Sequence, residues 1–288
     1  MNKRIMIGIP TFNGSHRVDN LLKSIFKWND QPTGYTTDIL LVDDASHAEK
    51  HEEMLWIAMH YNIPVIPHKE NFGITKSWND MAGFGGADII VLLNDDILVS
   101  QNWLTVMVYF LERNPGCGTV GWDQDFITYG DTQSVINSDN PIRIYRDPSS
   151  KKLFSFPRYP ESDRPGRHMA PTGSAFAFTR ESYELVGGFD ERFKSFYEEM
   201  DFSTKLVEQG KPGYMLHFPR LYHMFSQTFS ENDDFLRGSE ELARSRQKYI
   251  KKWGGDLDYT DKKFMPKIEP VRVQWLDNNL DEQEGVLS

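Results

Sequence analysis

The sequence predicts an α/β fold built on a mostly parallel central sheet with helices on its faces. The first third of the 288-residue chain alternates short apolar runs with segments of helical periodicity, as strand–helix–strand units do. Carboxylate and amide side chains follow several of these apolar runs directly. Ligand sites of open parallel sheets lie at that edge, so the same pattern predicts where a site should be.

Each element of the first third has its own local signal. The run at residues 88–93 is aliphatic, as in a strand buried on both faces, and the last helix of this part is stopped by Asn114, Pro115 and Gly116. Strands are predicted at residues 4–9, 38–42, 64–67 and 88–93, and helices at residues 18–28, 49–61, 74–84 and 103–113.

Residues 123–169 break the pattern, since they are rich in Pro, Ser, Asp and Arg without clear periodicity. In a compact domain such a long irregular connection is usually functional or disordered. The tail beyond about residue 275 is acidic, and we expect it to be mobile or to cover a neighbouring surface. Between these segments, strands are predicted at 173–179 and 213–218 and helices at 181–186, 197–209 and 235–253.

The composition limits the partners. Lys and Arg number 32 against 42 Asp and Glu, and this net charge of −10 opposes non-specific binding to nucleic acid or to an anionic membrane. The arginines and lysines of residues 143–167 leave a local basic patch possible. The single cysteine, Cys117, excludes an intrachain disulfide and a cysteine zinc site. No stretch approaches the roughly 20 apolar residues that span a bilayer, so a soluble, cytoplasmic protein is the default expectation.

The sequence LLNDDI at residues 92–97 is the most informative stretch, because an apolar run ends abruptly in Asn94, Asp95 and Asp96. Neighbouring carboxylates repel each other unless a positive group compensates them. A divalent cation that holds a substrate phosphate is a candidate, since hard cations take oxygen ligands from carboxylates and phosphates. A solvated turn after a strand is the alternative, because Asn and Asp favour turns on their own account.

Several further motifs occur in a recognisable order. They are IPTFNG at 9–14, VDDAS at 42–46, NFGITKSWN at 71–79, LLNDDI, the block at 173–210 that contains FYEEMD, LYHMFS at 221–226 and KYIKKWGG at 248–255. Together they resemble family 2 glycosyltransferases of the GT-A fold, specifically a cytosolic rhamnosyltransferase-like branch. The resemblance spans roughly residues 4–255, and it implies one GT-A domain with a helical C-terminal segment.

The resemblance implies that residues 1–121 form a half that binds a nucleotide diphosphate sugar, with UDP as the expected carrier and dTDP or GDP as alternatives. A carboxylate at 43 or 44 would accept a hydrogen bond from the nucleobase, although an Asx turn would also explain it. Lys76 is equally explained as a solvated surface lysine. The donor-binding residues implied in this way are Pro10, Thr11, Asn13, Asp43, Asp44, Asn71, Gly73, Lys76, Asn79, Asn94 and Asp95.

The resemblance also implies a metal, held by Asp96 and by His223 of the histidine motif. Asn94 replaces the first aspartate of the family's Asp-x-Asp motif but still offers a neutral oxygen. Mn²⁺ suits a mixed oxygen and imidazole donor set, and Mg²⁺ is the alternative. A lone histidine can also be structural, so this assignment depends on the order of the motifs.

Residues 122–230 would form the acceptor half, followed by a C-terminal helix and acidic tail at 231–288. An inverting transfer needs a carboxylate to accept the proton of the attacking hydroxyl, and Glu199 stands where the family has an aspartate base. Glu198 and Asp201 would assist it, although carboxylates at a helix start are also favoured by the helix dipole. The acceptor residues expected are Trp122, Asp123, Gly173, Ser174 and Glu198, and Trp122 has a core position as its alternative.

The sequence therefore predicts a metal-dependent inverting glycosyltransferase that uses a glycan or other hydroxyl acceptor, with residues 123–169 supplying acceptor specificity or a lid. One alternative is a virus-type transferase that glycosylates a hydroxymethylated base in DNA. Another is a non-catalytic module that binds a nucleotide sugar or a glycan. Nucleic acid is not the expected partner, because the net charge is negative.

Overall fold

The structure, a computed structural model, describes residues 2–127, 130, 132–137, 166–168, 171–224 and 235–254. The described strands form one mixed sheet in the order β3-β2-β1-β4-β8-β6-β9-β5, with β7 paired to β9. The strands are β1 (Lys3–Thr11), β2 (Tyr35–Asp43), β3 (Val65–Pro67), β4 (Ile89–Leu93), β5 (Ile97–Leu98), β6 (Thr119–Phe126), β7 (Gly166–His168), β8 (Ala175–Thr179) and β9 (Gly213–His223). The helices are α1 (Ser15–Trp28), α2 (Ala48–Tyr61), α3 (Ile74–Gly83), α4 (Trp103–Arg113), α5 (Thr132–Asn137), α6 (Arg180–Leu185), α7 (Glu198–Glu208) and α9 (Phe235–Trp253).

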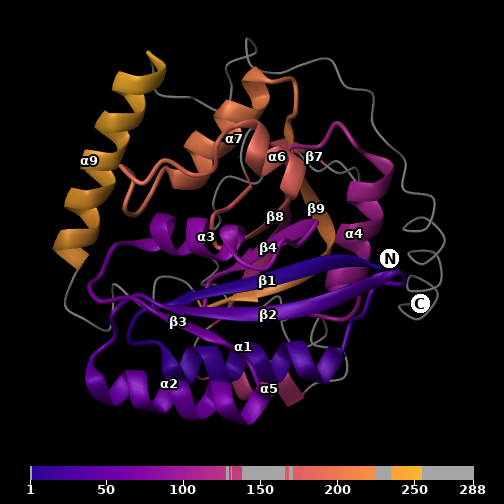
Figure 1. Cartoon of the computed structure of the whole chain (residues 1–288), viewed down its shortest axis with the longest axis vertical. Helices are drawn as coiled ribbons and strands as arrows, with labels where there is room; N and C mark the ends of the chain where they lie inside the picture. The colour runs from indigo at the N-terminus through magenta and orange to yellow at the C-terminus, as the bar shows by residue number, and fades with distance from the viewer. Residues whose placement is uncertain are drawn as a thin grey trace, which may run out of the picture.

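Helices cover both faces of the sheet (Figure 1). Along β1 and β4 the side chains alternate between two cores, so that Ile7 belongs to the core with α1, α2 and α4. Met6 belongs to the opposite core, together with Trp78 of α3 and Phe202 of α7. This two-sided burial explains why these strands read as continuous apolar runs.

The strand register brings distant loops to one edge of the sheet. Strands β2, β1 and β4 are parallel, so the loops that follow them emerge together. Strand β8 is antiparallel to β4 with Leu93 opposite Ala175, which places the residues before β8 beside the end of β4. Strand β9 is antiparallel to β5 with Ile97 opposite His223. Polar residues that follow β1, β2 and β4, precede β8 and end β9 therefore meet at this edge.

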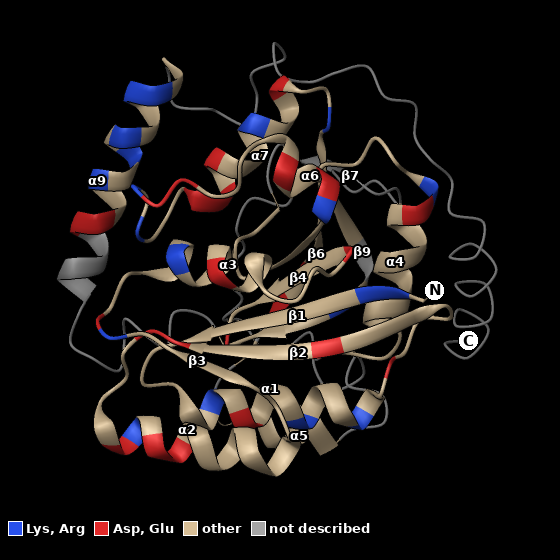
Figure 2. Ribbon diagram, viewed as in Figure 1, with Lys and Arg blue, Asp and Glu red and all other residues tan. Residues whose placement is uncertain are grey.

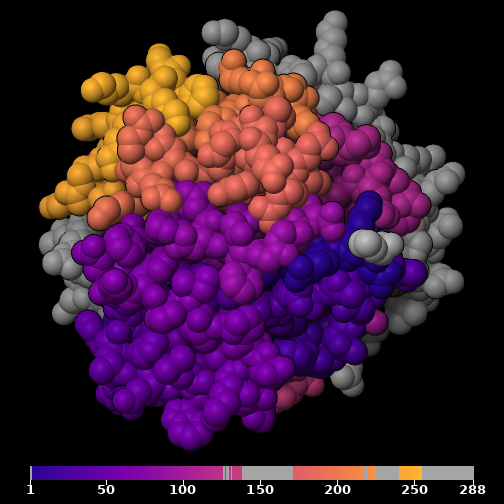
Figure 3. Space-filling model, viewed as in Figure 1, coloured from indigo at the N-terminus to yellow at the C-terminus, as the bar shows by residue number. Residues whose placement is uncertain are grey.

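Helix α9 packs on α7 at the outer end of the molecule, where the yellow atoms adjoin the orange ones in Figure 3. The Tyr249 hydroxyl lies 2.6 Å from Thr204 Oγ1, and the Trp253 indole N–H donates to Asp201 over 2.9 Å. No helix in the described part of the chain is long and apolar enough to cross a bilayer.

The predicted α/β architecture is confirmed, and the predicted helices and strands of the first third occur within a few residues of the expected bounds. Among the described elements, four were not predicted: the short strand β5, the strand β6, whose second half falls in the segment expected to be irregular, and α5 and β7, which lie within that segment. Most of residues 123–169, with the expected lid, and the acidic tail lie outside the described residues.

Candidate active site

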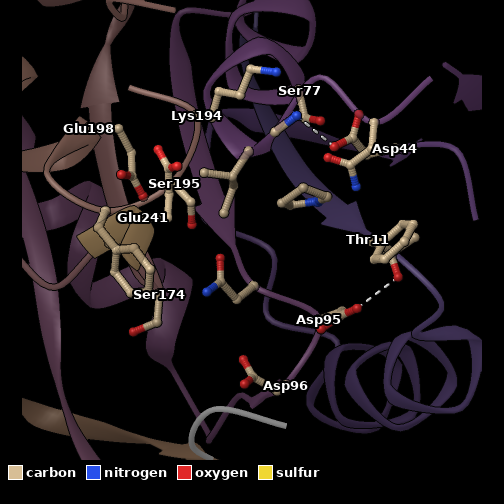
Figure 4. A pocket seen from close by; sticks show the side chains of 18 of the residues that line it. Thr11, Asp44, Ser77, Asp95, Asp96, Ser174, Lys194, Ser195, Glu198 and Glu241 are labelled. Atoms are coloured by element: carbon tan, nitrogen blue, oxygen red, sulfur yellow. Dashed lines mark hydrogen bonds between the residues drawn. The ribbon is translucent and has the colours of Figure 1, made fainter. Parts of the chain in front are cut away.

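A cavity of about 1220 Å³ opens at the sheet edge where these loops meet (Figure 4). Its walls come from the loops after β1, β2 and β4, from the residues before β8 and α7, and from α9. The predicted site residues that line it are Pro10, Thr11, Asn13, Asp44, Asn71, Gly73, Asn94, Asp95, Asp96, Gly173, Ser174, Glu198, Glu199 and His223.

Asp96 and His223 lie side by side in this cavity, with 3.3 Å between Asp96 Oδ2 and His223 Nε2. The chain is fixed there by the Met224 N–H, which donates to the Asp96 carbonyl over 2.9 Å. Asp96 Oδ1 and Asn94 Oδ1 are buried without a hydrogen-bond partner in the described structure. Buried polar atoms are normally satisfied, so these two oxygens, which line the cavity, are available to a ligand.

This donor set fits a divalent cation that completes its coordination with oxygens of a bound molecule. It combines a carboxylate, an imidazole and an amide oxygen, a mixture that Mn²⁺ accepts well. No cluster of three or more His, Cys, Asp or Glu able to hold a metal occurs in the described parts of the chain. The fit therefore requires ligands from a substrate, as is usual for cations that bind substrate phosphates.

Asp95 lines the cavity, but both of its oxygens are bonded within the protein. Thr11 Oγ1 donates to Oδ2 over 2.7 Å, and the fully buried Arg17 donates to Oδ1 over 3.0 Å and to Oδ2 over 3.3 Å. Burial raises the pKa of Asp95, while the guanidinium opposes the rise. Gly14 is required here, since a Cβ at this position would lie 2.0 Å from Asp95 Oδ2. The structure thus assigns Asp95 to an internal ion pair with Arg17, a partner that the sequence did not suggest.

Asp44 organises the loop that follows β3. Its carboxylate accepts the N–H groups of Phe72 over 2.9 Å and Gly73 over 2.8 Å, and His68 Nδ1 lies 2.7 Å away. Gly73 has a φ of 91°, and a Cβ there would lie 2.4 Å from the Lys194 carbonyl oxygen. The need for glycine therefore arises from contact with the protein backbone, in addition to any contact with a diphosphate.

Asn13 connects the loops after β1 and β2. Its N–H donates to Ser46 Oγ over 2.8 Å, and its side-chain oxygen accepts the His47 N–H over 2.8 Å. Asp43, the residue before Asp44, does not line the cavity. Its buried carboxylate accepts the Ser46 N–H over 3.0 Å and contacts His51. Of the two candidate carboxylates after β2, only Asp44 lines the cavity.

Glu198 and Glu199 begin α7 on the other side of the cavity. The chain enters this helix through Phe196 and Tyr197, both at positive φ (65° and 67°), which is an uncommon conformation for such large side chains. Burial raises the pKa of Glu199 to about 7, opposed by backbone N–H groups of the helix start. Burial and the neighbouring Glu199 raise the pKa of Glu198 well above its ordinary value.

Gly173 provides the floor on which the Glu199 side chain lies. A Cβ at position 173 would come within 3.1 Å of the Glu199 carboxyl carbon. Gly173 is thus a contact of the carboxylate itself. Its neighbour Ser174 donates to Gln124 Oε1 over 2.9 Å, and the Ser174 carbonyl accepts the Asn94 N–H over 2.8 Å. The residues before β8 therefore connect the two sides of the cavity.

The structure corrects three acceptor-side expectations. The Trp122 side chain is fully buried and donates to the Trp103 carbonyl over 3.3 Å, so it has the core position that was its alternative. Asp123 lies within β6 and pairs with Arg220 outside the cavity. Asp201 is fully buried and accepts the indole N–H of Trp253, so it attaches α9 and does not assist the base.

Two donor-side expectations are also corrected. Lys76 forms an ion pair with Asp80, one turn further along α3, and does not line the cavity. The Asn79 amide accepts the Phe189 N–H over 2.9 Å and donates to the Phe189 carbonyl over 3.1 Å. Both side chains therefore stabilise the protein around the cavity.

Other cavity residues were not predicted. Phe12 and His47 follow the ends of β1 and β2, a position that was a local signal for the sheet edge. The residues on α9 and before α7 have no local signal, because only the tertiary fold brings them here. These unpredicted lining residues are Phe12, His47, Ile74, Ser77, Thr172, Lys194, Ser195, Phe196, Glu240, Glu241 and Arg244.

The sequence model of glycosyl transferase family 2 matches residues 6–184, which is more than half of the chain. No curated protein matches the sequence of this chain. Solved structures with a similar fold include the mannosyltransferase PcManGT from Pyrobaculum calidifontis in complex with GDP-Man and Mn²⁺ (17% identity, TM-score 0.60, 87% of this chain and 65% of that chain).

Two further structures are similar at comparable levels. GalNAc-T7 with UDP, GalNAc and Mn²⁺ has 17% identity and a TM-score of 0.63, over 90% of this chain and 49% of that chain. TarS 1-349 of S. aureus has 15% identity and a TM-score of 0.56, over 90% of this chain and 76% of that chain. The chain thus spans about two thirds of the PcManGT chain and half of the GalNAc-T7 chain, and it shares their GT-A fold.

Proposed function

This chain belongs to glycosyl transferase family 2, and on that premise we propose that its cavity transfers a sugar from a nucleotide diphosphate sugar to an acceptor hydroxyl with inversion at the anomeric carbon. The observation that carries the proposal is a set of buried side-chain oxygens that have no partner in the described structure and that line this cavity. They are Ser77 Oγ, Asn94 Oδ1, Asp96 Oδ1 and Glu198 Oε2.

The donor is proposed to lie over residues 1–121, against the loops after β1, β2 and β3. UDP is the expected carrier, with dTDP or GDP as alternatives. The ligands of the similar structures, GDP-Man in one and UDP in another, support this class of donor. Asp44 retains lone-pair capacity beside its backbone bonds, which supports contact with a nucleobase N–H. The rhamnosyltransferase-like branch is proposed from the sequence motifs alone.

Asp96, His223 and Asn94 are proposed to hold Mn²⁺ or Mg²⁺. When bound, the cation would neutralise charge on the diphosphate and so stabilise the leaving group. The buried pairing of Arg17 with Asp95 has a related effect, because it removes one of two adjacent negative charges from the cavity floor. Asp96 is then the aspartate of the LLNDDI motif that is available to a cation.

Glu199 is proposed as the general base. Its carboxylate accepts the proton of the acceptor hydroxyl while that oxygen forms a bond to the anomeric carbon, and the bond from this carbon to the diphosphate breaks. The nucleoside diphosphate leaves with the electron pair. A carboxylate with a pKa of about 7 is well matched to this role, because a base is most effective when its pKa lies near the working pH.

A screen of UDP, dTDP and GDP sugars with Mn²⁺, which measures release of the nucleoside diphosphate, tests the proposal without knowledge of the acceptor. We expect slow hydrolysis of one donor that is abolished by EDTA and greatly reduced in Glu199→Gln. Nucleotide binding with no turnover of any donor would instead indicate a non-catalytic binding module.

A further inference from the structure

We propose that His68 is a positioning residue for the nucleotide. Its imidazole bridges Asp44 and Asp80 with both ring nitrogens, and in this way it holds the Asp44 carboxylate in the orientation that meets the nucleobase. The proposal rests on the proposed function, in which Asp44 contacts a nucleobase N–H. It adds a residue that does not itself line the cavity.

His68 directly follows β3, and its backbone brings the ring beside Asp44. The His68 N–H donates to the Asp43 carbonyl over 2.8 Å, which continues the pairing of β3 with β2. The His68 side chain is only 6% exposed. The Phe72 ring packs against it in a T-shaped arrangement, with 5.4 Å between the ring centroids. The imidazole is therefore fixed between the loops after β2 and β3.

Both ring nitrogens of His68 contact a carboxylate. Nδ1 lies 2.7 Å from Asp44 Oδ1, and Nε2 lies 2.9 Å from Asp80 Oδ2. A neutral imidazole has one N–H and one lone pair, so it can donate to only one of two carboxylates. A ring that is protonated at both nitrogens donates to both. The geometry therefore fits the doubly protonated ring, which carries a positive charge.

The partners of the two carboxylates favour their ionised forms. Asp80 also pairs with Lys76, one turn earlier on α3, and these two residues are the red and the blue band of that helix in Figure 2. Asp44 also accepts two backbone N–H groups of the loop after β3. Lys76, Asp80, His68 and Asp44 thus form a row of alternating charges that ends at the cavity.

This row leaves Asp44 with capacity for one more hydrogen bond. Oδ1 accepts from His68 and from the Phe72 N–H, whereas Oδ2 accepts only the Gly73 N–H. A carboxylate offers about four lone-pair sites, so Oδ2 keeps one for a ligand in the cavity that Asp44 lines (Figure 4). A fixed acceptor binds a nucleobase N–H better than a mobile one, because less side-chain freedom is lost on binding.

His51 provides a matched control for His68. It contacts Asp43, the other carboxylate after β2, with 2.5 Å between Nδ1 and Asp43 Oδ2. Neither residue of this pair lines the cavity. The two histidines therefore differ in whether their aspartate can reach a nucleotide, and replacement of each by Gln removes the imidazole from one pair at a time.

Titration calorimetry in EDTA with UDP, dTDP and GDP measures nucleotide affinity without the cation. For the nucleotide that the wild type binds most tightly, His68→Gln should raise Kd at least fivefold, because a bond from a charged donor to Asp44 is lost. His51→Gln should change Kd less than twofold. A smaller increase in His68→Gln, or an equal one in His51→Gln, would overturn the proposal.

A double variant tests whether His68 acts through Asp44. Residues of one hydrogen-bond network have non-additive effects, so His68→Gln should not raise Kd further once Asp44→Asn is present. A merely structural role would raise Kd by the same factor with and without Asp44→Asn. That result would contradict the proposal.

Imidazole ¹⁵N–¹H NMR spectra of the wild type test the same role without any variant that must fold. At pH 7 both ring nitrogens of His68 should carry protons, and the nucleotide should shift the ring signals of His68 but not those of His51. One ring proton on His68, or ring signals that the nucleotide leaves unchanged, would overturn the proposal. Failure of the proposed function is distinguishable, because the wild type would then bind none of the three nucleotides while both ring protons of His68 remain observable.

Discussion

His223 Nε2 lies 3.3 Å from Asp96 Oδ2, although the two residues come from opposite halves of the chain. The pairing of β9 with β5 produces this contact, since Ile97 lies opposite His223. The contact gives the LLNDDI motif an imidazole neighbour and, with the unsatisfied oxygens of Asn94 and Asp96, defines the proposed cation site.

Replacement of His223 tests its role in that site. We expect His223→Ala to raise the Mn²⁺ concentration that gives half-maximal donor hydrolysis more than tenfold, because one of few protein ligands is lost. His60→Ala, an exposed histidine on α2, is the control and should leave the Mn²⁺ dependence unchanged. The same Mn²⁺ dependence in both variants would show that His223 is structural.

The pKa of Glu199 predicts a pH profile. A base must be deprotonated to accept a proton, and burial raises the pKa of Glu199 to about 7. The value of kcat/KM should therefore fall about tenfold per pH unit below this pH and reach a plateau above it. In Glu199→Gln we expect a loss of roughly 10²-fold to 10⁴-fold in kcat and no such inflection. An inflection that persists in the variant would assign the base to another group.

Stability should depend on the same group. The pKa of Glu199 is higher in the folded protein than the ordinary value of 4.5, so the folded state binds more protons than the unfolded state between these values. This contribution is present at low pH and is lost as pH rises from about 5 to 7, by up to roughly 1.4 kcal/mol per pH unit. Glu199→Gln should accordingly be more stable than the wild type at pH 8 and similar at pH 4.5, as measured by urea unfolding.

The Arg17–Asp95 pair should make a large contribution that depends on both partners. Arg17→Met leaves a buried carboxylate without its cation, which we expect to cost about 3–5 kcal/mol. The double variant with Asp95→Asn should recover much of this loss, because the uncompensated charge is removed. Lys23→Met on the same helix, which breaks the exposed Lys23–Asp19 pair, should cost less than about 1 kcal/mol. Equal costs for the buried and exposed pairs would contradict the assignment.

Gly173 is predicted to position the base. Gly173→Ala places a Cβ 3.1 Å from the Glu199 carboxyl carbon, closer than ordinary van der Waals contact, so the carboxylate must shift by a few tenths of an ångström. Misplacement by a full ~1 Å can cost about a hundredfold in rate, so for this smaller shift we expect a loss of roughly threefold to tenfold in kcat. Gly116→Ala is the control, since no atom lies within 4 Å of its added Cβ. Full activity of Gly173→Ala would show that the contact is unimportant.

The sheet edge was largely predictable from sequence because strand ends are local signals. Each apolar run that ends in polar residues gave a position such as Asp44 or Asp96, and the parallel register then places these positions together. The roles of neighbouring residues were not predictable, since adjacent carboxylates look alike in sequence. Only packing shows that Asp95 turns to Arg17 while Asp96 turns to His223.

Residues on the acceptor side were predicted less well, because their positions depend on contacts far along the chain. Trp122 is an aromatic residue of the type that stacks on sugars, yet its position in β6 directs its side chain into the core. Asp201 follows the glutamates that start α7, but helix geometry turns it towards α9. The contribution of α9 to the cavity arises from the attachment of Ser245 and Lys252, for which the sequence has no local pattern.

Titration calorimetry of the preferred nucleoside diphosphate, with Mn²⁺ and with EDTA, measures how much the cation contributes to donor binding. We expect Mn²⁺ to tighten binding to the wild type by at least tenfold, about 1.4 kcal/mol, and this gain to be lost in Asp96→Asn. The same affinity in Mn²⁺ and in EDTA for the wild type, or an undiminished gain in Asp96→Asn, would rule out the proposed cation site.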